Sequence, residues 1–459
     1  MSEREPLIML GVDGMDWEFV SEHRSELPHL ADMAVLRPLR SIFPPDSIPA
    51  WTTIFTGIGP GDHGILESID YLDRRPAQAA ETAAEGLPKK TFWDELSRRG
   101  RKVCILNPFL AYPAWDVNGI MISGPVFVDG DASVTGVDPA DLGELPQLGG
   151  IVDFPTPRTM DQFVRDTLTT TRSQLDFGLH MFDRVRPDFL FLNILTVDRM
   201  QHFAWRYCDP GDPTYPGPNS HANAVLRIYQ EVDRALPEYL ARGRLVLLSD
   251  HGHGRRATRV LYVDELLRRH GLLAEAATGR RRFANILLER AKRAVLTASY
   301  RYALEEHAYR LARRLPNRKA LKQSSFSSDA GRSRARLSRA FGRNPHSGID
   351  VPDRADWQRV IGLLEEVVDP ETGEGVIDWV VPRDQLISGE MSERYPEIIF
   401  KLRDGYAVDF GMYGPLFGPN VNHRRVSGGH KEHGVLAMSF EAEAPSDLAE
   451  IYQFVLGSC

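Results

Sequence analysis

The stretch RLVLLSDHG (244–252) carries the clearest information about the fold. A short, continuous apolar run that ends in glycine is typical of a strand buried on both faces, as in a parallel sheet. Three further runs have the same form: PLIMLGVDG (6–14), RKVCILNPF (101–109) and DFLFLNIL (188–195). The four runs predict strands of one mainly parallel sheet.

Segments with helical spacing precede three of these runs. They are TFWDELSRRG (91–100), TMDQFVRDTLTTTRSQLDFGLHMF (159–182) and HANAVLRIYQEVDRALPEYLARG (221–243). Because strand and helix alternate, we expect an α/β fold, an α/β/α sandwich around a mainly parallel sheet. EIIFKLRDGYAVDF (397–410) and GVLAMSF (434–440) are expected to form the last strands. Ligands of such sheets gather beyond the carboxyl ends of the strands.

The net charge of −8 hides an uneven distribution of charged residues. Residues 279–345 contain 18 Lys and Arg against 4 Asp and Glu, a local charge of +14, so the remainder of the 459-residue chain carries −22. A basic segment within an acidic protein argues against a uniformly basic nucleic-acid binder, so nucleic acid is not an expected partner.

The basic segment also differs in pattern from its surroundings. Leu304 and Leu315 belong to a set of apolar residues that recur at helical spacing among arginines. We expect an inserted, mostly helical element at 275–345 between two parts of one core domain, 1–274 and 346–459. One hypothesis is a cap that attracts an anionic substrate; the alternative is an arginine-rich surface helix packed on the acidic core.

Cysteine content and hydropathy predict the compartment. Cys104, Cys208 and Cys459 are too few and too scattered for a disulfide framework or a cysteine-based zinc site. No stretch approaches the roughly 18–20 apolar residues of a membrane-spanning helix, and the N-terminal apolar run is too short for a signal peptide. The expected location is the cytoplasm.

The block TVDRMQHFAW (196–205) follows the third predicted strand. If it opens a helix, Asp198 and His202 stand four residues apart on one face, close enough to hold one metal ion. A hydrogen bond between the two side chains on the helix surface is the alternative interpretation.

The block LLSDHGHG (247–254) places Asp250 and His251 where a strand ends in glycines, so both side chains can turn toward a site at the sheet edge. His253 adds a third nitrogen. A polar turn whose aspartate caps a helix is the alternative. Further on, SGGHKEHGVLAMS (427–439) carries His430 and His433 in a glycine-bordered loop before a strand, the kind of loop where binding residues concentrate. Either histidine can also be structural.

The block PPDSIPAWTTIFTG (44–57) places Ser47 directly before a predicted helix. A hydroxyl there meets unsatisfied backbone N–H groups and the positive end of the helix dipole, both of which favour a phosphate. The alternative is that Ser47 is only the N-cap, with Pro49 in the first turn.

Taken together, these blocks supply three carboxylates, three imidazoles and one hydroxyl. The chain resembles the alkaline phosphatase superfamily, specifically its type I phosphodiesterase/nucleotide pyrophosphatase branch and the related phosphohydrolases and phosphomutases. The resemblance rests on GVDG, SIPAWTTIFTG followed by GDHGI, TVDRMQHFAWRY, SDHGHG and GGHKEHGVL, which run from the first strand to the last.

The resemblance implies two divalent metal ions, zinc in first place and manganese as the alternative. His430 rather than His433 fits the family's final block, in which a glycine follows the histidine after three residues, as Gly434 does here. One ion would be held by Asp198, His202 and His430, and the other by Asp13, Asp250 and His251 with the oxygen of Ser47. Ser47 would be the nucleophile and would form a phosphoseryl intermediate.

The implied substrate is a small-molecule phosphate ester, a phosphodiester of the nucleotide or nucleotide-sugar type. A phosphomutase or phosphomonoesterase would use the same metal site. Arg199 and Arg255 are candidates to bind the extra charge of a monoester, and Asn107 to donate to a phosphate oxygen, although a turn-forming Asn is equally consistent with the sequence. Sulfatase activity is not expected, because Trp51 occupies the position of that family's arginine. An inactive relative that binds a partner through its basic segment is the non-enzymatic alternative.

Overall fold

The chain folds into two compact units. The computed structural model describes residues 5–66, 85–126, 130–149, 155–276, 279–302, 304 and 328–459. The first unit comprises Met1–Arg255 and Arg425–Cys459, and the second comprises Arg256–Arg424.

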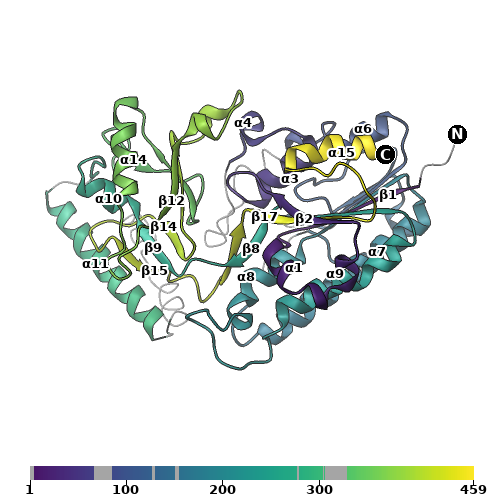
Figure 1. Cartoon of the computed structure of the whole chain (residues 1–459), viewed down its shortest axis with the longest axis horizontal. Helices are drawn as coiled ribbons and strands as arrows, with labels where there is room; N and C mark the ends of the chain where they lie inside the picture. Colours follow the sequence, from purple (N-terminus) through teal and green to yellow (C-terminus); the bar gives the residue numbers. More distant parts are fainter. Residues whose placement is uncertain are drawn as a thin grey trace. The chain divides into compact units, whose positions relative to one another are not determined.

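An eight-stranded sheet forms the centre of the first unit, in the order β2-β17-β7-β1-β6-β3-β4-β5 (Figure 1). The four strands predicted from continuous apolar runs are β7, β1, β3 and β6, and they pair in parallel, as expected. The strands of this sheet are β1 (Leu7–Val12), β2 (Val35–Arg40), β3 (Val103–Leu106), β4 (Gly119–Ser123), β5 (Ser133–Thr135), β6 (Phe189–Ile194), β7 (Arg244–Leu248) and β17 (His433–Met438).

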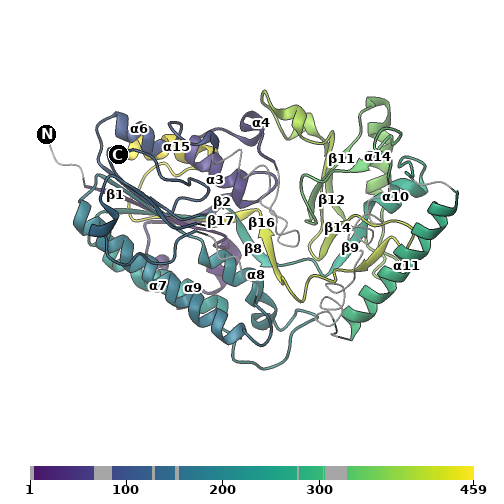
Figure 2. The ribbon, with the colours of Figure 1, turned by 180° about the vertical axis from the view of Figure 1, so that it is seen from behind.

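Helices cover both faces of this sheet, which confirms the predicted α/β/α sandwich. Alternate residues of β1 enter different cores: Ile8 and Leu10 pack with α1, α2, α7, α8 and α9, whereas Leu7 and Met9 pack with α3, α6 and α15. The two groups of helices lie on opposite sides of the sheet in Figures 1 and 2. The helices of the first unit are α1 (Trp17–Glu22), α2 (Pro28–Ala31), α3 (Ser47–Thr56), α4 (Pro60–His63), α6 (Phe92–Arg98), α7 (Met160–Val185), α8 (Thr196–Cys208), α9 (Ala224–Leu240) and α15 (Ile451–Ser458).

The two segments predicted to form the last strands belong to different sheets. GVLAMSF forms β17, which enters the main sheet antiparallel to β7 and β2. EIIFKLRDGYAVDF forms β13 (Ile398–Leu402) and β14 (Tyr406–Asp409), which belong to smaller sheets of the second unit. A two-stranded antiparallel ribbon of β8 (Gly252–Arg255) and β16 (Gly428–Lys431) completes the first unit.

The second unit contains a four-stranded antiparallel sheet, β10-β11-β13-β12, and a three-stranded sheet, β14-β9-β15. Its compact body spans Arg256–Arg424 and is therefore wider than the segment 275–345 expected from charge. Its remaining elements are β9 (Arg259–Tyr262), α10 (Val263–Arg269), α11 (Gly279–Arg301), β10 (Arg336–Leu337), β11 (His346–Asp350), α14 (Trp357–Glu365), β12 (Ile377–Pro382) and β15 (Phe417–Pro419).

The described part of the basic segment contains helix α11 and, after residue 327, the short strand β10. Several of its arginines pack within the second unit: the Arg293 guanidinium lies 3.6 Å from the ring centre of Tyr262, and Arg290 Nε donates to the carbonyl of Tyr413 at 3.1 Å. The predicted helical spacing between Leu304 and Leu315 falls mostly on 305–327, outside the described residues. Among the helices that the structure describes, none is long and apolar enough to cross a membrane.

Candidate active site

Three aspartates meet at the carboxyl edge of the main sheet. Asp13 directly follows β1, Asp198 lies in the first turn of α8 just after β6, and Asp250 comes two residues after β7. Because these three parallel strands are neighbours in the sheet, their carboxyl ends bring the three side chains together. All three carboxylates are buried, which predicts that something other than water compensates their charge.

Ser47 is the first residue of α3, and its hydroxyl faces this cluster. Its Oγ donates to Asp13 Oδ1 at 3.2 Å and lies 3.0 Å from His251 Nε2. The capping role falls to the preceding residue, since Asp46 is the N-cap and its carboxylate accepts from the backbone N–H of Ile48 at 3.4 Å. The Ser47 side chain is therefore not used as a cap.

The neighbouring hydroxyls of α3 are engaged differently. Thr52 Oγ1 donates to the carbonyl of Ile48 at 2.8 Å, and Thr53 Oγ1 donates to the carbonyl of Pro49 at 2.9 Å. Both bonds run back along the helix, as is usual for threonine inside a helix. Among the hydroxyls of this helix, that of Ser47 is the one that contacts the Asp13–His251 pair.

Four side chains form a first group of metal-ligand type: Asp198, His202, His253 and His430. Around Asp198 Oδ1, the Nε2 atoms of His202, His253 and His430 lie at 3.2, 3.4 and 3.6 Å. The Nε2 atoms of His202 and His430 are themselves 3.1 Å apart. Nitrogen lone pairs at such a distance repel each other unless a cation or a proton lies between them.

The other ring nitrogens of these histidines contact backbone carbonyls. His202 Nδ1 lies 3.1 Å from the carbonyl of Gly428, and His430 Nδ1 lies 2.9 Å from that of Pro45. A carbonyl can only accept, so each Nδ1 carries a hydrogen and, in the neutral ring, each Nε2 presents a lone pair to the cluster. Metal-binding histidines are typically oriented in this way.

The second group comprises Asp13, Asp250 and His251. His251 Nε2 lies 3.4 Å from Asp250 Oδ2 and 3.7 Å from Asp13 Oδ1. The remaining oxygens are oriented by the protein: Trp51 Nε1 donates to Asp13 Oδ2 at 2.9 Å, and the backbone N–H of Gly14 donates to Asp250 Oδ1 at 3.1 Å.

The electrostatics of the cluster fit a bound cation. Burial, aided by the charges of neighbouring aspartates, raises the pKa of Asp13 well above its usual value, and burial raises the pKa of Asp250 to about 6. Burial would also raise the pKa of Asp198, but the nearby imidazoles outweigh it and hold that pKa well below its usual value. Carboxylates together with imidazoles are the donors that zinc and manganese accept, so the residues present fit two divalent ions.

The three residues expected to contact substrate have partners within the protein. Asn107 is buried; its amide donates to the carbonyl of Asn193 at 3.0 Å and accepts from the N–H of Gly149 at 2.7 Å. Arg199, in α8 beside Asp198, is buried with its guanidinium 4.8 Å from the ring centre of Phe203. Arg255 is more exposed and pairs with Asp209 at 2.6 Å. Substrate contacts by these three residues remain predictions.

His253 is the residue of the cluster that sequence analysis left out of its ligand sets. The sequence shows a second histidine two residues after His251, but it does not show which side chains lie near that histidine in space. The pairing of β8 with β16 sets His253 directly opposite His430. In the sequence, β8 precedes the second unit and β16 follows it, so no local sequence pattern reveals this pairing.

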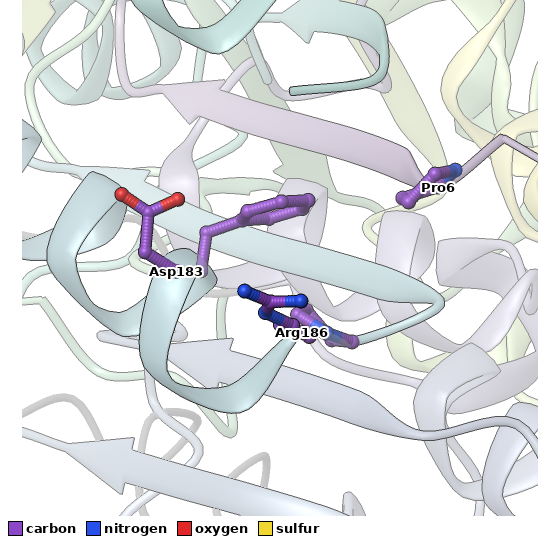
Figure 3. A pocket seen from close by; sticks show the side chains of 5 residues that line it. Pro6, Asp183 and Arg186 are labelled. Carbon is purple, nitrogen blue, oxygen red and sulfur yellow. The ribbon is translucent and has the colours of Figure 1, made fainter.

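A pocket elsewhere in the first unit lies away from this cluster (Figure 3). It includes Pro6, just before β1, and Pro187, just before β6, and is therefore at the amino ends of these strands. Asp13 and Asp198 lie at the opposite, carboxyl ends. The pocket is lined by Pro6, Phe182, Asp183, Arg186 and Pro187.

Comparison with protein families agrees with this geometry. The model of the family described as type I phosphodiesterase/nucleotide pyrophosphatase matches residues 7–429. The chain belongs to this family. The predicted resemblance is thereby confirmed, and the match extends from the first residue of β1 into β16, where it ends one residue before His430. None of the curated proteins that were searched matches the chain.

Solved structures support the fold of this type I phosphodiesterase family member. Crystal structures of phosphonoacetate hydrolase from Sinorhizobium meliloti 1021, with phosphonoformate and with phosphonoacetate, superpose with TM-scores of 0.58 and 0.55. In both cases the identity is 14%, and the alignment covers 99% of this chain and 96% of the other. At this identity the likeness concerns the fold.

Gly11 provides a test of how the sheet supports the cluster. A Cβ at Gly11, in β1, would lie 2.6 Å from Trp51 Cη2 and 2.9 Å from Asn193 Oδ1. We expect Gly11→Ala to lower the free energy of unfolding by about 1–3 kcal/mol, the usual cost of overpacking a core, and to weaken metal binding because Trp51 holds Asp13. Gly457→Ala, where no atom lies within 4 Å, is the control. Urea denaturation and metal titration measure both effects; equal stability of the two variants would contradict the argument.

Proposed function

We propose that this chain is a metal-dependent phosphodiester hydrolase that uses Ser47 as its nucleophile. The observation that carries the proposal is the position of the buried Ser47 hydroxyl, in contact with both Asp13 and His251 at the carboxyl edge of the sheet. Membership of the type I phosphodiesterase family agrees with it.

Two sets of ligands would hold the metal ions, with zinc as the expected metal and manganese as the alternative. Asp198, His202 and His430 would form one site, and Asp13, Asp250 and His251 would form the other, with the oxygen of Ser47. When bound, two such ions stabilise negative charge on the attacking and leaving oxygens of an in-line displacement.

The residues of the chain have distinct roles in this reaction. Asp13 and His251 orient Ser47 Oγ, which attacks the phosphorus while the ester oxygen leaves from the opposite side. This step releases one alcohol, which takes up the proton of the Ser47 hydroxyl, and leaves a phosphoseryl intermediate that still carries the second ester group. Water then hydrolyses this intermediate to release a phosphate monoester and restore the Ser47 hydroxyl. Ser47 begins α3, so the positive end of the helix dipole favours the phosphate at this position.

The expected substrate is a small-molecule phosphate ester, with a phosphodiester first and a nucleotide or a nucleotide sugar as further candidates. A phosphomutase or a phosphomonoesterase would use the same Ser47 and the same ligands, and differs only in where the phosphoryl group goes. The structural neighbours are phosphonate hydrolases, so a phosphonate is included among the substrates to be tested. The three free cysteines agree with action in a reducing compartment such as the cytoplasm.

A substrate panel with metal analysis tests this function. The purified protein is loaded with zinc or manganese and assayed with bis(p-nitrophenyl) phosphate, p-nitrophenyl phosphate, nucleotide sugars and phosphonoacetate. We expect about two metal ions per chain and the highest kcat/KM on a diester. If the protein binds no divalent metal and Asp250→Ala leaves every activity unchanged, the enzyme hypothesis fails, and a binding protein becomes the better interpretation.

A further inference from the structure

His253 is placed by strand pairing beside the first group of ligands. It lies in β8, directly opposite His430 in β16. Residues that face each other across an antiparallel pair project to the same face of the ribbon. Both imidazoles therefore point toward the same carboxylate, that of Asp198, with Nε2 distances of 3.4 and 3.6 Å.

The distances in this group match those of a tetrahedral metal site. Metal–ligand bonds of about 2.0 Å give a tetrahedron with edges of about 3.3 Å. The edges from Asp198 Oδ1 to His202, His253 and His430 are 3.2, 3.4 and 3.6 Å, and the edge between His202 and His430 is 3.1 Å. His253 thus lies at the same spacing as the other two histidines.

The His253 ring is buried and held in place, but its Nε2 is not used by the protein. The side chain is inaccessible to solvent, and among the described residues Nε2 has no hydrogen-bond partner. Its backbone N–H donates to Asp16 Oδ2 at 3.0 Å, and its ring stacks on Trp205 at 5.9 Å. A buried, oriented nitrogen without a partner normally costs stability, so it requires an explanation.

Gly428, which lies opposite Arg255 in the same ribbon, leaves room for the His253 ring. A Cβ at Gly428 would lie 2.4 Å from His253 Cε1 and 2.4 Å from the carbonyl of Gln201. Glycine at this position is therefore needed for the imidazole to reach Asp198 from β8.

We propose that His253 is the fourth protein ligand of the metal ion held by Asp198, His202 and His430, and that this makes the first site the tighter of the two. The inference rests on the proposed two-metal site and deepens it. The first site would then have three nitrogens and one oxygen, a donor set that suits zinc.

The second site has a different donor set. It offers two carboxylates, from Asp13 and Asp250, and one imidazole, from His251, together with the Ser47 oxygen. Carboxylate and hydroxyl oxygens suit harder ions such as manganese better than imidazoles do. When the metal-free protein is given zinc and manganese together, we expect zinc in the first site and a mixed population in the second.

Cobalt binding to a single-site protein tests the role of His253 without any activity measurement. A His251→Ala background disables the second site, so that Co²⁺ reports only the first. In this background we expect the intense visible absorption of four-coordinate Co²⁺. Adding His253→Ala should weaken Co²⁺ binding by more than about 100-fold, beyond the 10–100-fold typical for a residue that only supports a ligand, and should shift the absorption bands.

The controls separate ligation from folding. His433→Ala, at the exposed first residue of β17, should leave both affinity and spectrum unchanged. His253→Gln keeps a polar side chain of similar reach and should also shift the bands, while circular dichroism reports whether each variant folds.

Two outcomes separate this inference from the proposed function. An unchanged cobalt spectrum in a folded His253→Ala or His253→Gln variant would overturn the role of His253 while leaving the two-metal site intact. A wild-type protein that binds no divalent metal would overturn both.

Discussion

Replacing Ser47 by alanine is expected to lower kcat on a chromogenic phosphodiester by roughly 10⁴-fold or more, the scale on which enzymes lose activity with their nucleophile. The reason is that Ser47 Oγ is the hydroxyl of α3 that contacts Asp13 and His251. All the proposed aspartate and histidine ligands are unchanged, so metal content should stay near that of the wild type. Stopped assays of product, with metal analysis of the same samples, measure both quantities.

The matched control for this experiment lies in the same helix. Thr52 Oγ1 bonds to the carbonyl of Ile48, so Thr52→Ala removes a buried hydroxyl of α3 without touching Asp13 or His251. We expect Thr52→Ala to retain activity. If instead Ser47→Ala stays active and Thr52→Ala is inactive, the nucleophile is Thr52, and the mechanism must be rebuilt around it.

Trapping the intermediate gives an independent measurement. Rapid acid quench of the wild-type protein with a diester that carries a radiolabelled phosphorus should leave label on the peptide that contains Ser47. The Ser47→Ala variant should carry none. Label at a histidine instead would indicate a different covalent route.

The main sheet could be predicted from sequence because its strands are buried on both faces. Such strands read as continuous apolar runs, and β1, β3, β6 and β7 are examples. Residues after these strands then had to meet at one edge, which is why Asp13, Asp198 and Asp250 could be chosen without a structure. Short segments of sequence were therefore enough to predict that these three aspartates meet.

The second unit could not be delimited in the same way. Its strands β11 and β13 pair antiparallel across a long stretch of chain, and their partners are not identified by any local pattern. Net charge drew attention to 275–345, but charge describes the surface, and the unit's apolar core includes residues on both sides of that segment, such as Leu261 and Phe400. The charge of the segment 275–345 therefore identified part of the second unit but not its bounds, Arg256–Arg424.

Two details of the site were ambiguous for the same physical reason. Asp46 and Ser47 are both good caps, and only the backbone shows that the helix begins at Ser47, which releases its hydroxyl for the cluster. His253 follows His251 by two residues, but its role depends on the register with His430. The sequence therefore predicts the type of side chain at the site to within one or two positions. Only the backbone conformation shows which of the neighbouring residues faces the cluster.

Asp198→Asn is expected to have the second large effect, because this carboxylate is shared by all three imidazoles of the first group. Its Oδ1 lies 3.2–3.6 Å from the Nε2 atoms of His202, His253 and His430. Asparagine has nearly the same shape but lacks the negative charge that compensates a divalent cation. We expect the metal content to fall from about two ions per chain to about one, and kcat to fall by about 10²–10³-fold, the typical cost of removing one such electrostatic element.

Zinc separates the two contributions of Asp198 to stability. In the metal-free protein the nearby imidazoles hold the pKa of Asp198 well below its usual value, so its charge stabilises the fold, and we expect Asp198→Asn to be less stable than the metal-free wild type. Added zinc should raise the melting temperature of the wild type far more than that of the variant. Asp161→Asn, an exposed carboxylate paired with His221 at 3.3 Å, should respond to zinc as the wild type does. An equal zinc-induced rise in melting temperature for Asp198→Asn and wild type would show that Asp198 holds no metal, because the coupling between metal binding and folding would then pass through other residues.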